Sequence, residues 1–314
     1  MKYMQIKFNS YIRPAFRPCN GLVCAGAVLL IAASTQAQNL FVAGGYDHTI
    51  YEYTPGGAQS TFATGLSGGG LAFNSAGNLF ETDTGTGSIY EFTPGGSQST
   101  FASGLNYPGG LAFNSAGDLF VADNGAGNIY KYTPGGVQSL FASGLSNPGA
   151  LAFDRAGNLF VANSGAGSIL EFTPGGAQSI FASGLSTPVG LAFDSAGNLF
   201  ETDFLGGNVN EFTPGGAQST FSSGWLYAQA LAFDTAGNLY LFEGSYLNSA
   251  VIKFTSGGGE STFASGLSVP TTDGLAFQGV SLPVPEPPVF GLLAAGMIAF
   301  LACRRQACPR ATRR

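Results

Sequence analysis

Short apolar runs recur along the middle of the chain and are separated by glycine, proline and asparagine. The tripeptide Leu-Ala-Phe begins at residues 71, 111, 151, 191, 231 and 275, at spacings of 40, 40, 40, 40 and 44. One complete unit, residues 111 to 150, reads LAFNSAGDLFVADNGAGNIYKYTPGGVQSLFASGLSNPGA. It contains four β-prone runs, LAF, DLFVAD, NIYKYT and QSLFAS, with turn residues between them. This pattern predicts one four-stranded antiparallel sheet per unit.

Polarity increases from the first strand of each unit to the last. Leu111 and Phe113 point to one side of the first strand and Ala112 to the other, so this strand has no polar side and we expect it to be buried on both. The fourth strand is rich in serine, threonine and glutamine. A sheet with a buried inner strand and a polar outer strand, repeated about every 40 residues, is typical of a β-propeller blade.

The strand count predicts how many blades there are and how they close. Six first strands are matched by six second strands, which begin near residues 40, 79, 119, 159, 199 and 239. The chain enters the repeat at a second strand and leaves it after a first one. We therefore predict an all-β, six-bladed propeller over residues 38–280, closed by pairing LAFQGV with the sheet that begins at Leu40. Closure leaves no long free edge; the alternative, an open β-solenoid, would not need complementary ends.

The connections between strands fall on two opposite faces of the predicted ring. The face that we call the turn face carries the first-to-second turns, such as NSAGN, and the third-to-fourth turns, such as TPGG. Pro94 followed by Gly95 predicts a type II turn with a positive φ at Gly95. The opposite loop face carries the second-to-third and inter-blade loops, which differ among the copies. Such variation favours a recognition face, although loops also vary without any functional reason.

The N-terminal segment has the features of a signal peptide. Four basic residues precede an apolar core at residues 22 to 33, and the tripeptide Thr-Gln-Ala that ends at residue 37 supplies small residues for cleavage. We therefore predict a signal peptide at residues 1–37, Gln38 as the first mature residue, and the Sec translocon and signal peptidase as partners. Cys24 lies at the start of the apolar core and follows Val23, which argues against a lipoprotein site.

Cysteine and charge both separate the terminal segments from the body. All four cysteines lie outside residues 38 to 283. An exported body without cysteine has no disulfide framework and must be stable through its own core. The body holds three basic residues against seventeen acidic ones, so its net charge is 3 minus 17, or −14. Nucleic acid requires a basic footprint and is therefore excluded as a partner.

The C-terminal segment carries three features in order. A Pro-rich linker, residues 281–288, contains Val284-Pro285-Glu286-Pro287. An apolar run at residues 289–303 follows, and as a helix it would be about 22 Å long against a hydrocarbon core of roughly 30 Å. Five arginines then end the chain, beginning with Arg304 and Arg305, and they would stop transfer and stay cytoplasmic.

These C-terminal features together resemble the PEP-CTERM sorting signal of Gram-negative bacteria, which would occupy residues 281–314. The resemblance implies processing at the PEP motif by an exosortase-type enzyme and a transient tether to the inner membrane. It also implies a final location at the cell surface or in the matrix of a cell that makes exopolysaccharide, a further candidate partner. The alternative is an unprocessed tail anchor with a single membrane span, which the short apolar run disfavours.

Aromatic residues gather on the predicted loop face, mainly around the fifth and sixth blades. Their flat faces could stack on sugar rings while neighbouring polar groups bind hydroxyls. The alternative is that aromatic residues such as Trp225 and Phe204 fill a gap between two blades. The candidate ligand-binding residues are Tyr46, His48, Tyr107, Phe204, Trp225, Tyr227 and Tyr246.

Acidic residues end several of the second strands. Asp83, Asp123 and Asp203 belong to different blades, so we expect each to cap its own Gly-rich loop by accepting backbone N–H bonds. A calcium site is the alternative interpretation of these residues, and no other cofactor is indicated. Glu81 and Glu201 replace valine in two second strands, but their blades stand on opposite sides of the ring, so the two cannot act as a carboxylate pair.

The body also resembles the NHL and gluconolactonase-like propeller repeats, as in PGGLAFNSAGDLFVADNGAGNIYKY from Pro108. The resemblance covers about residues 39 to 280, and such propellers include both enzymes and binding modules. Gluconolactonase-like enzymes hold a divalent metal near the axis, whereas only glycine or alanine precedes each Leu-Ala-Phe here. We therefore predict a non-enzymatic binding protein for glycan or another envelope component. The alternative is a metal-dependent lactonase, a hydrolase or a lyase, in the last two cases using His48 with Asp47.

Overall fold

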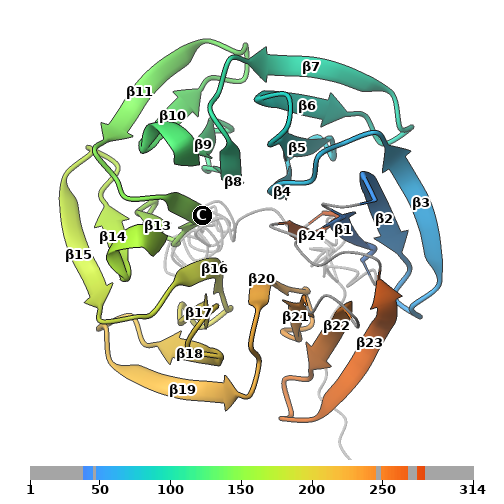
Figure 1. Cartoon of the computed structure of the whole chain (residues 1–314), viewed down its shortest axis with the longest axis vertical. Coiled ribbons are helices and arrows are strands. Elements are labelled where there is room, and N and C mark those ends of the chain that lie inside the picture. Colours follow the sequence, from blue (N-terminus) through green and yellow to red (C-terminus); the bar gives the residue numbers. More distant parts are fainter. Residues whose placement is uncertain (1–37, 45–46, 245–248, 268–273, 280–314) are drawn as a thin grey trace, which may run out of the picture. The chain divides into compact units, whose positions relative to one another are not determined.

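The computed structural model describes residues 38–44, 47–244, 249–267 and 274–279. These residues form six four-stranded antiparallel sheets arranged as a ring around a central axis (Figure 1). The prediction of an all-β, six-bladed propeller is confirmed. The predicted signal peptide and the segment from residue 280 onward lie outside the described residues.

The blades are numbered in chain order, each from its inner to its outer strand. Blade 1 consists of β24 (Leu275–Phe277), β1 (Leu40–Gly44), β2 (Thr49–Tyr53) and β3 (Gln59–Thr64). Blade 2 consists of β4 (Leu71–Phe73), β5 (Leu79–Asp83), β6 (Ser88–Phe92) and β7 (Gln98–Ser103). Blade 3 consists of β8 (Pro108–Phe113), β9 (Leu119–Asp123), β10 (Asn128–Tyr132) and β11 (Gln138–Ser143).

The remaining blades repeat this order. Blade 4 consists of β12 (Pro148–Phe153), β13 (Leu159–Asn163), β14 (Ser168–Phe172) and β15 (Gln178–Ser183). Blade 5 consists of β16 (Pro188–Phe193), β17 (Leu199–Asp203), β18 (Asn208–Phe212) and β19 (Gln218–Ser223). Blade 6 consists of β20 (Ala228–Phe233), β21 (Leu239–Glu243), β22 (Ser249–Phe254) and β23 (Glu260–Leu267). Single 3₁₀ turns, η1 (Asn124–Ala126) and η2 (Ser164–Ala166), lie in the loops after β9 and β13.

The ring closes as the incomplete ends of the repeat predict. Strand β24 pairs with β1, with Leu40 opposite Phe277 and Val42 opposite Leu275. These four residues share one buried cluster with side chains of blade 6. All the described strands and all six core clusters lie within residues 40–277. Residues 38–279 therefore hold every strand and core contact from which the ring is built, and an open solenoid is excluded.

Aromatic rings connect each blade to the next. In blade 2, the Phe80 ring of β5 meets Phe101 of the outer strand at a centroid distance of 5.2 Å and Phe113 of the next blade's inner strand at 5.0 Å. Phe101 in turn meets Tyr132 of blade 3 at 5.8 Å. The same three contacts recur at all six blade junctions, with centroid distances between 4.8 and 6.0 Å. Edge-to-face pairs add about 0.5–1.5 kcal/mol beyond the area they bury.

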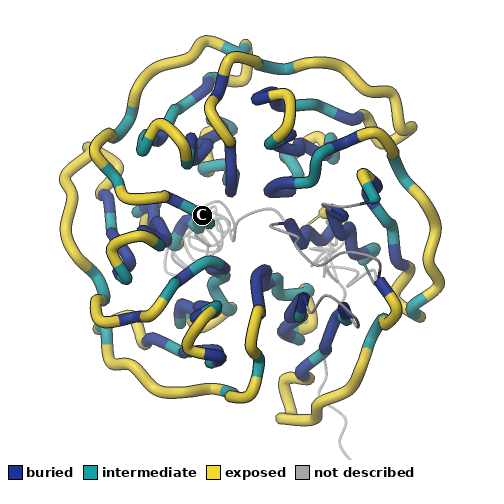
Figure 2. The backbone as a smooth tube through the Cα atoms, in the orientation of Figure 1, coloured by how far each residue is buried: buried dark blue, intermediate teal, exposed yellow. Residues whose placement is uncertain are grey.

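Exposure increases toward the outside of the ring, as the polarity of the repeat predicts (Figure 2). The inner strand, however, is less buried than expected. Leu111 is buried, whereas Ala112 and Phe113 are half-buried because they border a cavity on the ring axis. Alternation shows that a strand has two apolar sides, but it does not show that both sides are covered.

The inner strands approach each other closely at the axis. A Cβ added to Gly190 would lie 2.4 Å from the carbonyl oxygen of Gln229, and one added to Gly70 would lie 2.9 Å from that of Gly109. The Thr82 hydroxyl connects two of these strands, because it accepts the Gly70 amide at 2.8 Å and donates to the Gly109 carbonyl at 2.7 Å. The glycine or alanine before each Leu-Ala-Phe is therefore explained by packing.

The TPGG turns differ from the predicted type. The positive φ falls on Gly96, at 80°, and not on Gly95. The Gly96 amide donates to the Thr93 carbonyl at 2.8 Å, and Thr93 receives the amide of Ser97 on its hydroxyl at 3.2 Å. A turn followed by a left-handed glycine is the usual three-residue hairpin with a bulge, which fits the twist of the flanking strands. The type II prediction was wrong because either glycine could supply the positive φ.

Removal of β24 should open the ring. A fragment of residues 38–267 exposes the edge of β1 and loses Leu275 and Phe277 from a buried cluster. Loss of one buried Phe alone typically costs about 3–5 kcal/mol, so we expect the Tm to fall by about 10 °C or more. Thermal unfolding followed by circular dichroism, with residues 38–283 as the control, measures the difference. Equal Tm values would show that the fold does not depend on closure.

Candidate functional site

The carboxylates that end the second strands hold the loop face together. Asp203 accepts the amide of Thr187 at 2.8 Å and that of Gly206 at 3.2 Å on one oxygen, and the amide of Ser186 at 2.9 Å on the other. Gly206 lies in the loop of the same blade, whereas Ser186 and Thr187 lie in the preceding inter-blade loop. One side chain therefore ties two loops.

The equivalent aspartates of blades 2 and 3 also accept backbone amides. Asp83 accepts the amides of Thr86 at 2.8 Å and Ser67 at 3.1 Å. Asp123 accepts the amide of Asn106 at 2.9 Å. Burial raises the pKa of Asp123, and the hydrogen bond from the Asn106 amide opposes the rise. The loop-capping interpretation is confirmed for Asp83 and Asp203, whereas Asp123 accepts from the preceding inter-blade loop and makes no cap hydrogen bond to η1. Within residues 38–279, as far as they are described, no three His, Cys, Asp or Glu side chains are grouped to hold a metal ion.

Two of the predicted aromatic residues are held outward by an uncommon backbone conformation. Tyr107 has φ 60° and a side chain that is 64% exposed, and Tyr227 has φ 71° and is 41% exposed. Both lie at the same point of their inter-blade loops, where Asn147 has φ 49°. A left-handed conformation is uncommon for residues other than glycine and is unfavourable for a large side chain. Such strain tends to persist at functional sites.

Phe204 and Tyr227 are brought together although 23 positions separate them in the sequence. Their rings meet edge to face at 5.3 Å, and the Tyr227 amide donates to the Phe204 carbonyl at 3.2 Å. Leu205 and Leu226, which are 60% and 55% exposed, adjoin the pair along the chain. Sequence reasoning missed both leucines, since a single exposed leucine in a loop carries no signal. Together the four residues form an apolar area that we call the blade 5 patch.

Trp225 has a different environment. Its indole N–H donates to the Ser222 hydroxyl at 2.7 Å, and its ring meets Phe254 of blade 6 edge to face at 5.8 Å. Trp225 also packs against the core cluster between blades 5 and 6. The structure therefore places Trp225 as packing between two blades, which is the alternative raised from the sequence.

His48 and Asp47 are neighbours in sequence but bind different groups. The His48 Nδ1 lies 3.0 Å from the Leu66 carbonyl oxygen, which can only accept, so Nδ1 carries the proton in this contact. Tyr51 donates its hydroxyl to Asp47 at 2.5 Å, and this bond, together with burial, raises the pKa of Tyr51 to about 12. The structure does not bring the two together as an acid–base pair. The other two candidates, Tyr46 and Tyr246, lie outside the described residues.

Glu81 and Glu201 are fully buried carboxyl groups. Both Glu81 oxygens lack a hydrogen-bond partner, and Glu201 accepts one bond, from the Asn210 amide at 2.9 Å. Burial raises the pKa of each to about 8, with smaller contributions from Asp83 and Asp203 and, for Glu201, a lowering by Asn210. The two lie in β5 and β17, on opposite sides of the ring (Figure 1). They are separate buried acids and not a catalytic pair.

The fold and its two faces place the chain in the class of six-bladed β-propellers. No protein-family model matches the chain, and no curated protein matches it. Among the helical turns that the structure describes, none is long and apolar enough to cross a membrane.

Solved structures share the fold at low sequence identity. A chain in the crystal structure of the nidogen/laminin complex aligns with a TM-score of 0.69 and 22% identity, over 77% of this chain and 98% of that chain. Virginiamycin B lyase from Staphylococcus aureus aligns with a TM-score of 0.58 and 15% identity, over 73% of this chain and 85% of its own. A gluconolactonase from Xanthomonas campestris aligns with a TM-score of 0.58 and 18% identity, over 67% and 84%. At these identities the likeness shows the propeller architecture alone.

The buried acids should make stability fall as pH rises. Each is neutral in the fold up to a pH of about 8 but ionises near pH 4.5 when unfolded. Since the folded state then binds more protons between these values, the contribution of these two groups to the free energy of unfolding is highest below pH 4.5 and decreases toward pH 8. Glu81→Val with Glu201→Val, which copies Val121 and Val161 of other blades, should raise the Tm at pH 8.5 by about 5 °C or more.

Thermal melts from pH 5 to pH 8.5 check this. The double variant should show a flatter Tm profile than the wild type. Glu91→Gln changes a half-buried acid of blade 2, the blade that contains Glu81; it is the control and should keep the wild-type slope. A wild-type profile as flat as that of the double variant would contradict the assignment.

Proposed function

We propose that this protein is an exported, non-enzymatic binding protein that holds glycan on the loop face of its propeller. The observation that carries the proposal is the presence of three aromatic rings on one face: Tyr107 and Tyr227, which are exposed left-handed residues, and the half-buried Phe204, which contacts Tyr227. Aromatic faces provide apolar contact to the C–H groups of a sugar ring, while neighbouring polar groups bind its hydroxyls. The exposed side chains of Asn106 and Asn147 lie in the same set of loops.

The capping carboxylates support a binding role. The carboxylates of Asp83, Asp123 and Asp203 accept backbone amides and hold the loops in place. In the proposal, aromatic and amide side chains then bind the ligand. A surface of this kind can bind a neutral polysaccharide without a metal ion. Among the fold relatives, one chain comes from a binding complex and two are enzymes. The His48 and Asp47 side chains bind different groups, which gives no support to the lyase or hydrolase alternative.

The positions of the two described chain ends support attachment to the cell from the turn face. The Gln38 side chain donates to the Gln278 carbonyl at 2.8 Å and accepts the Thr235 amide at 3.1 Å, beside a first-to-second turn. Both described ends of the chain therefore meet on the turn face. The segments before Gln38 and after Gly279 start from the face opposite the displayed aromatic rings, so a tether there would leave the loop face accessible.

We further propose that the C-terminal segment is a sorting signal of the PEP-CTERM type. The proposal rests on the order of Val284-Pro285-Glu286-Pro287, a short apolar run, and the arginines from Arg304 onward. Signal peptidase, the Sec translocon and an exosortase-type enzyme are then the processing partners. The mature protein belongs at the cell surface or in the exopolysaccharide matrix of a Gram-negative bacterium.

Mass spectrometry of protein recovered from the surface of the producing cells tests the sorting proposal. We expect a mature N-terminus at Gln38 and a C-terminus near Glu286, without the arginine tail. Replacing Glu286 with Ala should leave the tail attached and retain the protein in the membrane fraction. Surface protein with an intact Arg314 would contradict the proposal and favour a permanent tail anchor.

Retention on the producer's isolated exopolysaccharide tests the binding proposal. Tyr107→Asn with Tyr227→Asn removes both rings but keeps a residue that Asn147 shows to be compatible with this backbone. We expect about 10-fold weaker retention or more, from the loss of two stacking contacts. Leu140→Thr, an exposed outer-strand change to the residue that other blades carry, is the control and should bind as the wild type. Unchanged retention by the correctly folded double variant, or metal-dependent turnover of lactones by the wild type, would overturn the proposal.

A further inference from the structure

An apolar cavity of about 260 Å³ lies on the ring axis, on the turn-face side. All six inner strands contribute the same two residues of their Leu-Ala-Phe sequence to its wall. The small alanine at the middle position leaves space where a larger side chain would fill the axis. The repeated wall residues are Ala72, Phe73, Ala112, Phe113, Ala152, Phe153, Ala192, Phe193, Ala232, Phe233, Ala276 and Phe277.

One residue breaks the sixfold pattern at the edge of this cavity. Arg155 lines the cavity in blade 4, at a position where four of the other repeats have serine or threonine, as in Ser115 and Ser195, and the last repeat has Gly279. Its guanidinium donates to the Ser195 carbonyl of the next blade and forms no ion pair with any acid in the described part of the chain. Guanidinium has five N–H donors, so most of its donor capacity is available to a ligand.

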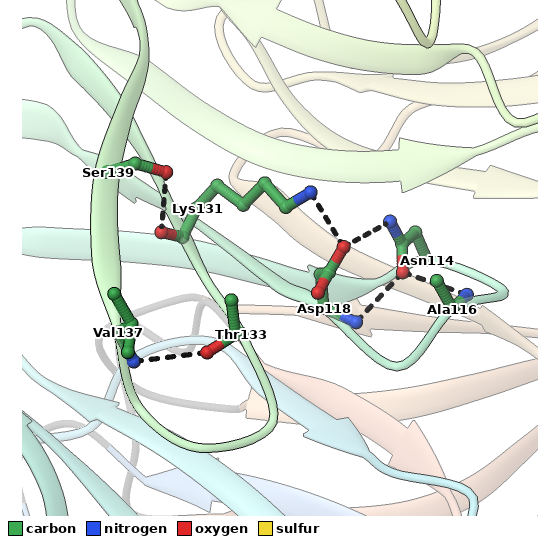
Figure 3. Close-up of polar contacts among 7 residues, drawn as sticks. All are labelled: Asn114, Ala116, Asp118, Lys131, Thr133, Val137 and Ser139. Atoms are coloured by element: carbon green, nitrogen blue, oxygen red, sulfur yellow. Dashed lines mark hydrogen bonds and ion pairs between the residues drawn. The ribbon is translucent and has the colours of Figure 1, made fainter.

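The other described basic residues are occupied elsewhere. Lys131 forms an ion pair with Asp118 at 2.7 Å, and Asp118 also accepts from the Asn114 side chain (Figure 3). Lys253 lies over the Tyr240 ring at 5.2 Å from its centroid. Both lie in third strands, β10 and β22, away from the inner strands that line the axis.

Asp194, which also lines the cavity, is bound within its own turn. Asp194 accepts the amides of Ala196 and Asn198, each at 2.8 Å, and its second oxygen accepts from the Asn198 side chain at 3.0 Å. It is therefore not the partner of Arg155. A single cation stands at the edge of an apolar cavity in a body whose net charge is −14.

We propose that the axial cavity binds a small amphipathic carboxylate, with its apolar chain among the Ala and Phe side chains and its carboxylate on Arg155. The volume is near the lower end of the roughly 300–1,000 Å³ found for ligand pockets, which suits a single short chain. A guanidinium binds a carboxylate through two parallel hydrogen bonds. The site lies on the face opposite the displayed aromatic rings and does not rest on the proposed function.

Three probes with the same ten-carbon chain and different head groups test the proposal: decanoate, decanol and decyltrimethylammonium. Binding is measured by isothermal titration calorimetry on residues 38–279, which contain every strand and core cluster that the structure describes. Non-specific binding to a body of charge −14 would favour the cation. We expect the opposite order, with decanoate binding tightest and decyltrimethylammonium weakest.

Two variants locate the site. Arg155→Ser restores the residue that Ser115 and Ser195 show to be compatible with this turn, and it should weaken decanoate binding about 10-fold or more while decanol changes little. Ala152→Leu should fill the cavity and weaken all three probes, and a wild-type circular dichroism spectrum checks that it folds. Equal binding of decanoate and the cation by the wild type, or unchanged decanoate binding in Arg155→Ser, would overturn the proposal.

Discussion

The edge-to-face packing of aromatic rings between neighbouring blades is the contact on which the structure depends. Each blade supplies one ring from every one of its four strands, and the second-strand and outer-strand rings of one blade meet the inner-strand and third-strand rings of the next. Because every blade must present the same rings at the same heights, the four aromatic positions can hardly change. The turns and loops that connect the strands are free of this constraint. The connections on the turn face have a different role from those on the loop face.

The turn face and the loop face therefore have different structural roles. On the turn face, short hairpins hold the strands in register, and their sequences are nearly alike in all copies except for single departures such as Arg155. On the loop face, a carboxylate or amide ends the second strand in five of the six blades, and Asp83 and Asp203 each fix two longer loops through backbone amides. Loops anchored by their backbone can vary their side chains without loss of shape. The aromatic residues of the loop face and Arg155 at the axial cavity are therefore both departures from the repeat, whose other residues serve packing.

Much of the fold was predictable because the same strand pattern recurs six times in the sequence. The period, the strand order and the complementary ends together determine the number of blades and the closure by β24. The turn type was not predictable from TPGG, because two adjacent glycines can each take a positive φ. The axial cavity was not predictable either, because alternation along a strand shows which side a residue faces but not whether another strand covers it.

The candidate site was predictable in part, for a similar reason. Sequence shows that an aromatic residue lies in a loop, but backbone conformation decides whether it points outward, as Tyr227 does, or packs between blades, as Trp225 does. Glu81 and Glu201 were visible as departures from valine, yet only their burial shows that they are uncharged in the fold. The contact between Phe204 and Tyr227 depends on how two loops lie side by side. A local sequence pattern does not predict this arrangement.

The closure of the ring also determines how the protein meets mechanical tension. A pull on the C-terminal segment enters at β24, the innermost strand of blade 1, which is held by three residue pairs with β1. Detaching it requires these pairs to separate together with the buried packing of Leu275 and Phe277, whereas an outer strand could be peeled away one residue at a time. The strand that completes the fold is thus also the point through which force reaches it, and its resistance limits how hard the propeller can be pulled before the ring opens.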